Sequence, residues 1–175
     1  MSCRHNFHPD CEKALNDQIN MELYASHIYL SMGSFFEHPD IDLPNVTKYF
    51  YNASQEEKQH AQMFINYVNK RGGCVKLGPI SAPDNNCNNL LEAFEMALNI
   101  ETVVNQSLLD IHKLADKYND AQLTDTLEST FLIEQVDSMR EIHGHITNIK
   151  RCIEGHGKGL GEYMFDKYIL GDKIQ

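Results

Sequence analysis

Hydrophobic side chains recur every three to four residues along four long stretches of this chain, the spacing that places them on one face of an α-helix. Proline stands near the start of the first two stretches, and a proline or a pair of glycines follows the end of each. The pattern predicts helices over about residues 9–37, 44–71, 91–118 and 121–154, and a short fifth helix over about residues 160–170.

The connections between these helices predict how they pack. The first pair and the second pair are each joined by a few residues, so each pair should form an antiparallel hairpin. Residues 72–90 contain two prolines and no helical period, and a segment of this length can cross a bundle from end to end. We therefore predict an all-α four-helix bundle, one domain over residues 1–175, whose long crossover lets helices two and three run parallel.

The short fifth helix has an apolar stripe of its own, formed by Leu160, Met164 and Tyr168. A stripe that remains after a four-helix bundle is complete more often caps the bundle than does anything else. We therefore expect these residues to cap the bundle, and a surface that faces a partner is the less favoured alternative.

Each long apolar stripe is interrupted near its middle by a polar residue: Glu22, Glu57, Glu101 or Gln135. His60 follows Glu57 by three positions, which puts both side chains on one face of the second helix. Antiparallel packing brings the middles of the helices to one level, so these five side chains should meet. Taken alone, the Glu57–His60 pair is more often a surface ion pair; the similar interruptions on the other helices favour a shared buried site.

Three carboxylates in a dry bundle centre carry a penalty that bound cations relieve. Oxygen-rich ligation with one nitrogen favours iron or manganese over a structural zinc, which normally uses more cysteine and histidine. The residues therefore predict a two-metal carboxylate site. Its halves differ, because Glu57-x-x-His60 on the second helix corresponds to Gln135-x-x-Ser138 on the fourth. This asymmetry suits an ion that passes through the site.

Composition narrows the partners and the compartment. The chain has 175 residues and a formal net charge of −10, which argues against binding to nucleic acid or an anionic membrane and favours attraction of cations. No apolar run reaches the length of a membrane span and the amino terminus lacks the core of a secretory signal, so we expect a cytoplasmic protein. Five cysteines without C-x-x-C spacing predict free thiols: Cys3, Cys11, Cys74, Cys87 and Cys152.

Five motifs along the chain carry a resemblance to a known family: Glu22-Leu-Tyr-Ala-Ser, Glu56-Glu57-x-x-His60-Ala, Val104-Asn-Gln-Ser-Leu-Leu, Glu134-Gln135 and Leu160-x-Glu-Tyr-x-Phe-Asp-Lys. With them the sequence resembles, over nearly its whole length, the eukaryotic ferritins of the heavy-chain, ferroxidase-active type. The resemblance implies iron storage and detoxification, in which Fe(II) is oxidised by dioxygen and kept as a ferric oxide mineral. The implied container is a hollow cage of twenty-four subunits, either identical or mixed with other ferritin subunits.

The resemblance also implies roles for individual residues. Glu22, Glu57 and His60 match the ligands of the first of two irons per subunit, and Glu57 also bridges to the second iron, which Glu101 and Gln135 complete. Iron is then both the metal of the centre and, with dioxygen, the substrate.

For other positions near the implied centre, the resemblance gives a role that is less definite than that of a ligand. Tyr29 matches a tyrosine beside the centre, where a redox role and a core tyrosine bonded to a buried carboxylate fit the sequence equally well. Ser138 falls where family members vary, and Glu56 matches an inner-surface acid associated with iron in transit and with mineral nucleation. Relatives usually place an acid at Gln59 and often another at Gln62, so we predict ordinary Fe(II) oxidation but weaker or slower mineral nucleation.

Asp125 and Glu128 lie three residues apart near the start of the fourth helix. Read alone, they are first-turn acids that suit the helix dipole. By resemblance they line three-fold channels through which Fe(II) enters the cage, where three copies of each make a negative field. His112 matches a position near the outer approach to that channel and fits an ordinary surface histidine equally well.

Three further residues invite a metal interpretation that we do not adopt. His143 and His145 are two positions apart, about 200° around a helix, so they cannot share an ion within one chain and are expected in solvent or at an interface. Tyr168 stands where some relatives carry a histidine on the four-fold axis, so no metal is expected there.

Two other functions fit a helical bundle with buried polar residues. A di-iron oxygenase acting on an organic substrate normally keeps a second Glu-x-x-His, which Gln135-x-x-Ser138 lacks. A non-catalytic shell subunit, whose buried polar residues only pair with one another, differs from an enzyme in its rate of aerobic Fe(II) oxidation.

Overall fold

The computed structural model describes residues 3–83 and 88–171, and every regular element in these ranges is helical. The fold is the predicted all-α four-helix bundle with a short C-terminal helix, and the helices begin and end within two residues of the predicted limits. In chain order the α-helices and π-helices (η) are α1 (Pro9–Glu37), α2 (Pro44–Lys70), α3 (Leu90–Lys117), α4 (Ala121–Thr126), η1 (Leu127–Leu132), α5 (Ile133–His156), α6 (Lys158–Met164) and η2 (Phe165–Leu170). Among these elements, no helix is both long enough and apolar enough to cross a membrane.

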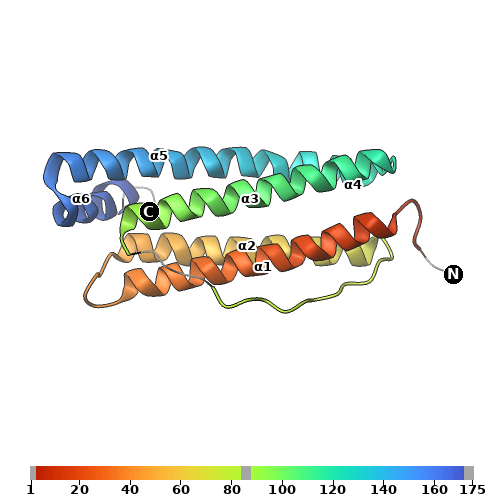
Figure 1. Cartoon of the computed structure of the whole chain (residues 1–175), viewed down its shortest axis with the longest axis horizontal. Helices are drawn as coiled ribbons and strands as arrows, with labels where there is room; N and C mark the ends of the chain where they lie inside the picture. Colours follow the sequence, from red (N-terminus) through yellow and green to blue (C-terminus); the bar gives the residue numbers. More distant parts are fainter. Residues whose placement is uncertain (1–2, 84–87, 172–175) are drawn as a thin grey trace.

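Figure 1 shows two pairs of antiparallel helices, α1 with α2 and α3 with the rod formed by α4, η1 and α5. The crossover leaves the end of α2, runs back along the first pair and reaches the start of α3, so α2 and α3 run parallel as predicted (Figure 1). Residues 84–87 of this crossover lie outside the described residues. α6 and η2 close one end, where they pack against α5 and α2.

The first part of the crossover is attached to α1 by a regular set of hydrogen bonds. Backbone N–H groups donate to side-chain oxygens of α1 in three steps: Cys74 to Glu12 (2.9 Å), Lys76 to Asn16 (2.6 Å) and Gly78 to Asn20 (3.0 Å). Two residues of extended chain span about 6.6 Å and four residues of α-helix rise about 6 Å, so the two repeats match. One face of α1 therefore holds the crossover in an extended path.

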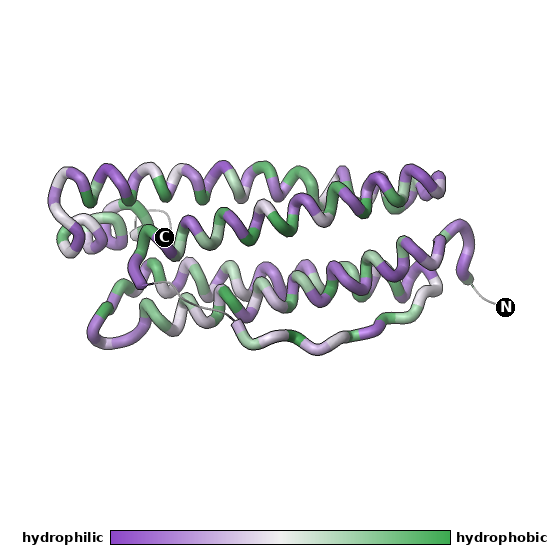
Figure 2. The backbone as a smooth tube through the Cα atoms, viewed as in Figure 1, coloured by the Kyte–Doolittle hydropathy of each residue, from purple (hydrophilic) through white to green (hydrophobic). Residues whose placement is uncertain are grey.

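Apolar side chains fill the bundle on both sides of a polar middle layer. Figure 2 shows hydrophobic and hydrophilic positions alternating along each long helix, as expected for helices with one buried face. One apolar cluster, at the end closed by η2, includes Phe36, Phe50, Phe94 and Phe165. The other, toward the opposite end, includes Leu15, Phe64, Leu108, Leu123 and Phe131.

The fourth rod is not a continuous α-helix, which the apolar pattern did not predict. Its buried positions Leu123, Leu127, Phe131 and Gln135 keep a constant spacing of four, which in an α-helix drifts about 120° around the axis over three steps. A π-helix has about 4.4 residues per turn, so the six residues of η1 remove about 110° of that drift. The π-helix therefore keeps Gln135 on the buried face.

The prediction that Leu160, Met164 and Tyr168 cap the bundle is wrong. Leu160 and Tyr168 are 55% and 64% exposed, whereas Gly161 and Phe165 face the bundle. The reason is the close approach of α6 to α5: a Cβ on Gly161 would lie 2.7 Å from the carbonyl group of the preceding helix at residue 152. Only a glycine fits there, and its inward position turns the neighbouring leucine outward.

Asp166 on η2 caps the start of α2 from a distant part of the chain. Leu43, the N-cap residue of α2, makes no side-chain capping bond. Asp166 Oδ1 instead accepts the backbone N–H groups of Asn45 at 2.8 Å and Val46 at 2.9 Å, and the carboxylate is fully buried. These bonds satisfy donors that a helix start leaves without partners, and they hold the C-terminal helix on the bundle.

Candidate metal centre

The polar residues that interrupt the apolar stripes lie together between the two apolar clusters. Glu22, Glu57 and Glu101 come from three different helices and are between 1% and 5% exposed. Gln135 is also buried, while His60 is partly exposed. Ligand atoms of Glu22, Glu57 and His60 all lie within 4.8 Å of one another, and no other group of His, Cys, Asp or Glu in the described parts of the chain has this geometry.

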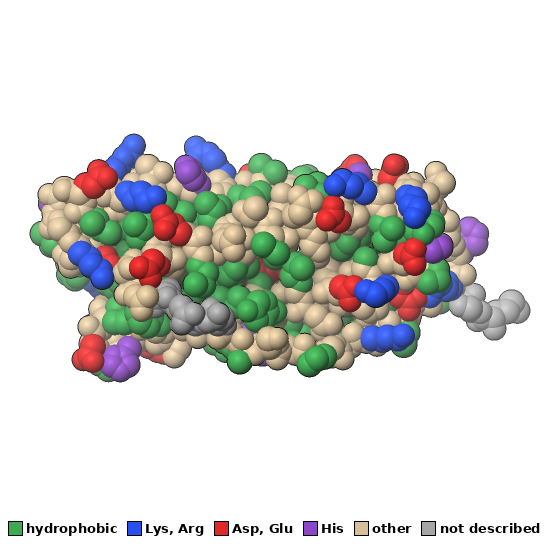
Figure 3. Space-filling model, viewed as in Figure 1, with side chains coloured by type: hydrophobic (Ala, Val, Ile, Leu, Met, Phe, Trp, Pro, Cys, Tyr) green, Lys and Arg blue, Asp and Glu red, His purple; other side chains and the backbone are tan. Residues whose placement is uncertain are grey.

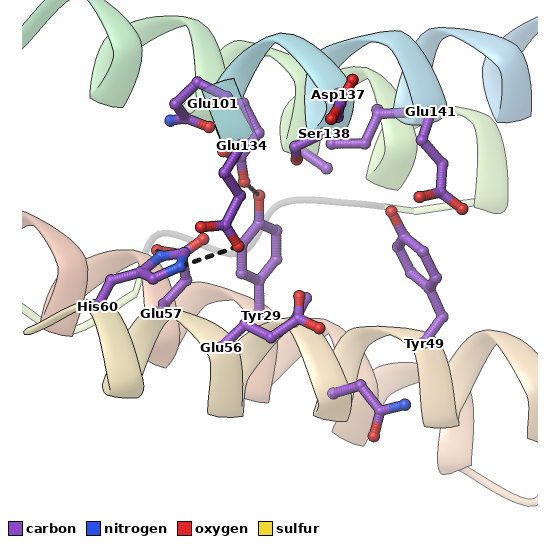
Figure 4. Close-up of a pocket in the computed structure, with 15 residues that line it drawn as sticks. Tyr29, Tyr49, Glu56, Glu57, His60, Glu101, Glu134, Asp137, Ser138 and Glu141 are labelled. Carbon is purple, nitrogen blue, oxygen red and sulfur yellow. Dashed lines mark hydrogen bonds and ion pairs between the residues drawn. The ribbon is translucent and has the colours of Figure 1, made fainter. Parts of the chain in front are cut away.

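A cavity of about 380 Å³ opens beside this cluster. Figure 4 shows that side chains from both helix pairs point into it. The cavity is lined by Tyr29, Tyr49, Glu56, Glu57 and His60 from the first pair and by Glu101, Glu134, Gln135, Asp137, Ser138 and Glu141 from the second.

Tyr29 is bonded directly to one of the buried carboxylates. Its hydroxyl donates to Glu101 Oε1 at 2.5 Å, and its ring is 2% exposed. Burial and the charge of Glu101 raise the pKa of Tyr29 well above its ordinary value, so the phenol keeps its proton. Of the two interpretations of this tyrosine, the contact matches the core tyrosine that orients a carboxylate.

Burial favours the protonated form of two carboxylates in the cluster, Glu22 and Glu101. Burial raises the pKa of Glu22 well above its ordinary value, and the charge of Glu57 raises it further. Burial and then the charge of Glu57 likewise raise the pKa of Glu101 to about 7, against the hydrogen bond from Tyr29. Since the charge of Glu57 acts on both groups, Glu57 lies close to each of them. A bound cation would replace these protons as the source of positive charge.

His60 is held by carboxylates on both ring nitrogens. Its Nδ1 lies 3.3 Å from Glu57 Oε2 and its Nε2 lies 3.2 Å from Glu134 Oε1. Burial disfavours the charged imidazole, but the hydrogen bond and charge of Glu57 outweigh it and raise the pKa of His60 to about 9. A metal ion must therefore displace a proton from the imidazole ring to bind His60 through a ring nitrogen.

The donor set fits metal ions. Glu22 Oε2 is buried and has no hydrogen-bond partner within the described residues. Such an oxygen is costly unless a proton or a cation binds it. Carboxylates with an imidazole and an amide are ligands that suit iron in helical bundles. Five side chains can supply them: Glu22, Glu57, His60, Glu101 and Gln135.

Sequence reasoning missed two neighbours of this cluster. Gln18 lies one helical turn before Glu22 and is fully buried, and it donates to Glu22 Oε1 at 2.8 Å. Its spacing of four from Glu22 was the available signal. Glu134, which contacts His60, was assigned no role, although it stands directly before Gln135 in the quoted motif.

The structure separates the predicted channel residues from the centre. Asp125 and Glu128 are exposed on α4 and η1. Glu128 Oε1 lies 2.6 Å from His112 Nε2 on α3. A channel built from three chains stays a prediction. On α2, the exposed side chains of Gln59 and Gln62 lie outside the cavity, whereas Glu56 lines it.

The expectation that His145 faces solvent or an interface is wrong. Its side chain is 2% exposed, and its ring packs edge-on against Phe94 and Phe165 at centroid distances of 5.4 and 5.6 Å. His145 follows buried Ile142 by three positions, which puts both on the inward face of α5. His143 is exposed, as expected.

A four-helix bundle with a long crossover and a central cluster of carboxylates and histidine defines the class of ferritin-like proteins. Comparison with known proteins agrees: the family model of the ferritin-like domain matches residues 12–152. The chain is also 49% identical over 168 residues to the soma ferritin of Lymnaea stagnalis, a match that covers 95% of this chain and 94% of that protein. This chain belongs to the ferritin family. Membership supports iron storage in multi-subunit shells as its general role.

Proposed function

We propose that this chain is a catalytic ferritin subunit, a ferroxidase that oxidises Fe(II) with dioxygen and passes Fe(III) on for storage as a ferric oxide mineral. The observation that carries the proposal is the buried group of Glu22, Glu57 and His60, whose ligand atoms lie within 4.8 Å of one another. Glu101 is close enough to Glu57 for the charge of one to shift the pKa of the other. Two ions can therefore share Glu57.

Each residue has a role in holding the two Fe(II) substrates. Glu22 and His60 bind the first ion together with Glu57, which also reaches the second ion, and Glu101 and Gln135 complete that second position. The chain keeps the two cations close together in a largely buried cavity, where dioxygen takes one electron from each. The amide of Gln135 supplies no charge, so the second position holds its ion less firmly and suits release toward the mineral.

We propose further that 24 copies of the chain, alone or mixed with other ferritin subunits, form the shell. Large apolar side chains that are exposed on the single chain are available to be buried between subunits, which is consistent with assembly. Figure 3 shows apolar side chains lying among the charged ones on one face of the molecule. Those at least half exposed include Leu30, Leu77, Val103, Ile133, Val136, Leu160, Tyr163 and Tyr168. In this shell Asp125 and Glu128 line the three-fold inlets for Fe(II).

A cytoplasmic location is part of the same proposal. The described cysteines Cys3, Cys11, Cys74 and Cys152 are all free, as predicted, and Cys87 lies outside the described residues. Unpaired thiols are typical of proteins in a reducing compartment.

The initial rate of aerobic Fe(II) oxidation tests the catalytic assignment. Glu57→Ala and His60→Ala proteins should assemble, as light scattering after size exclusion would show, yet lose at least about 10-fold in rate because the ligand set is broken. Ser26→Ala is the matched control, since Ser26 is buried on α1 but hydrogen-bonds to Ser54. Wild-type rates in an assembled Glu57→Ala shell would refute the assignment and leave a non-catalytic shell subunit.

A further inference from the structure

Gln18 and Ser107 connect α3 to the carboxylate of Glu22 through a chain of hydrogen bonds. Gln18 is 0% exposed and lies one helical turn before Glu22 on α1. Its Nε2 donates to Glu22 Oε1 at 2.8 Å, and its Oε1 accepts the hydroxyl of Ser107 at 2.5 Å. Three side chains from two helices thus form one chain of hydrogen bonds that ends at the cluster of Glu22, Glu57 and His60.

The chemistry of these groups fixes the direction of this chain of hydrogen bonds. Glu22 is ionised when it binds a cation, and an ionised carboxylate only accepts hydrogen bonds. Gln18 therefore presents its NH₂ group to Glu22 and its carbonyl oxygen to Ser107. Against a carbonyl oxygen, the hydroxyl of Ser107 can only donate. The flipped amide would set two acceptors against each other at Glu22, so the carboxylate selects the orientation of the amide. Ser107 then anchors the far end of the amide in that orientation by donating to its carbonyl oxygen.

The two oxygens of Glu22 are unequal as a result. Oε1 is occupied by the amide of Gln18. Oε2 is buried, and no donor in the described ranges bonds it. The same carboxylate contributes to the group with Glu57 and His60. One oxygen is thus anchored while the other remains available to a cation.

We propose that Gln18 and Ser107 are positioning residues of the metal site: together they fix the Glu22 carboxylate in its ligating orientation before iron arrives. This inference rests on the proposed function, and it adds a second layer of residues behind one ligand. The benefit is pre-organisation, because a carboxylate already fixed in place loses less rotamer freedom when the ion binds.

Ser26 and Ser54 show what a purely structural tie between helices looks like in this bundle. Their hydroxyls donate to each other's backbone carbonyl oxygens at 2.7 and 2.8 Å, joining α1 to α2 without touching the metal cluster. The chain of hydrogen bonds through Gln18 differs because it buries an amide completely and ends on an ionisable ligand. Burying a polar amide is costly unless both of its ends are bonded, as they are here.

The test measures Co(II) binding to the purified, assembled protein without oxygen, since Co(II) absorption reports both affinity and ligand geometry. Gln18→Leu should weaken the site that contains Glu22 by about 10-fold and alter its visible spectrum, as is typical when a partner of a ligand is lost. Ser107→Ala should weaken it by a smaller factor, and Ser107→Thr, which keeps the hydroxyl, should restore it. Ser26→Ala should match wild type in affinity and spectrum.

The double variant is the decisive arm. If Ser107 acts only through Gln18, adding Ser107→Ala to Gln18→Leu should change nothing further, whereas two independent packing effects would add. Full additivity, or wild-type affinity and spectrum in both single variants, would overturn the proposal. Should Gln18→Leu not assemble, the comparison of Ser107→Ala with Ser107→Thr still decides it. Glu22→Ala distinguishes a failure of the proposed metal site from a failure of the positioning role. If that protein binds Co(II) as wild type does, the metal assignment itself fails.

Discussion

The hydroxyl of Tyr29 on α1 crosses the bundle to donate a 2.5 Å hydrogen bond to Glu101 on α3. The bond favours the ionised carboxylate, so it lowers the pKa of Glu101, which burial and Glu57 together raise to about 7. Tyr29 therefore helps to keep Glu101, one of the proposed metal ligands, free of its proton near neutral pH.

Replacement of this tyrosine should weaken metal binding in a pH-dependent way. In Tyr29→Phe the pKa of Glu101 rises, and Co(II) affinity at pH 7 should fall by about 10-fold, the value of a hydrogen bond to a charged group. At pH 9 both proteins have ionised Glu101, so the difference should narrow. Tyr67→Phe, in the other apolar cluster, is the control. A loss of oxidation rate beyond the loss of affinity would indicate the redox role instead.

The metal-free protein should lose stability as pH rises from 5 to 9. Glu101 and His60 both have a pKa above the unfolded value, so each binds a proton more tightly when folded. Stability from Glu101 is present below pH 4.5 and lost toward about 7, and that from His60 is present below 6.5 and lost toward about 9.

Guanidinium unfolding of the metal-free protein across this range measures the loss. In Glu101→Gln the free energy of unfolding should fall less between pH 5 and 7, by on the order of 2 kcal/mol, because the amide does not titrate. An unchanged slope in Glu101→Gln would show that the raised pKa of this group does not contribute.

Removing the cap of α2 should destabilise the whole bundle. In Asp166→Ala the N–H groups of Asn45 and Val46 lose their acceptor, at a cost of about 2 kcal/mol. Asp17→Ala is the comparison, since Asp17 forms an exposed pair with Lys13 and should contribute less than about 0.5 kcal/mol. Denaturant unfolding gives both values, and equal losses would argue against the capping role.

The crossover should loosen locally when its anchors on α1 are removed. Asn16 accepts the N–H of Lys76 at 2.6 Å and donates to the carbonyl of Cys74 at 3.1 Å. Asn16→Ala should therefore speed hydrogen exchange at the Lys76 amide by about 10-fold. Amides in the middle of α3 serve as the internal reference and should keep their protection. Unchanged exchange at Lys76 would mean that another contact holds the segment.

Mineral growth should respond to acids restored on α2. The double variant Gln59→Glu, Gln62→Glu should oxidise Fe(II) at the wild-type rate but form its ferric core faster at equal iron loading, because both exposed positions lie outside the cavity and gain cation-binding charge. Gln106→Glu on α3 controls for added charge alone. Identical core formation in the double variant and wild type would remove the nucleation hypothesis.

The sequence predicted helix limits and the central cluster well, because both depend on local signals. Pro9, Pro44 and the glycines after α2 mark helix ends by backbone chemistry that needs no tertiary context. A carboxylate such as Glu22 inside an apolar stripe is visible for the same reason.

Features that depend on contact between helices were not predictable in this way. The orientation of α6 depends on how closely Gly161 approaches α5, which no periodicity encodes. His145 is buried because three aromatic rings surround it, from Tyr49, Phe94 and Phe165. The partner of Gln18 is Ser107, and the two lie on different helices far apart in the sequence.

Because of the π-helix η1, Leu123 and Gln135 face the same side of the rod only when the number of residues between them is kept. Which residue types fill that interval matters less. Conservative substitutions within Leu127–Leu132 change single contacts, but deleting one residue there would turn every later side chain of the rod by about 100°. Gln135, Ile142 and Ile149 would then leave the interior together. Natural variation in this segment should accordingly appear as exchanges of residues, with gains or losses of single residues selected against.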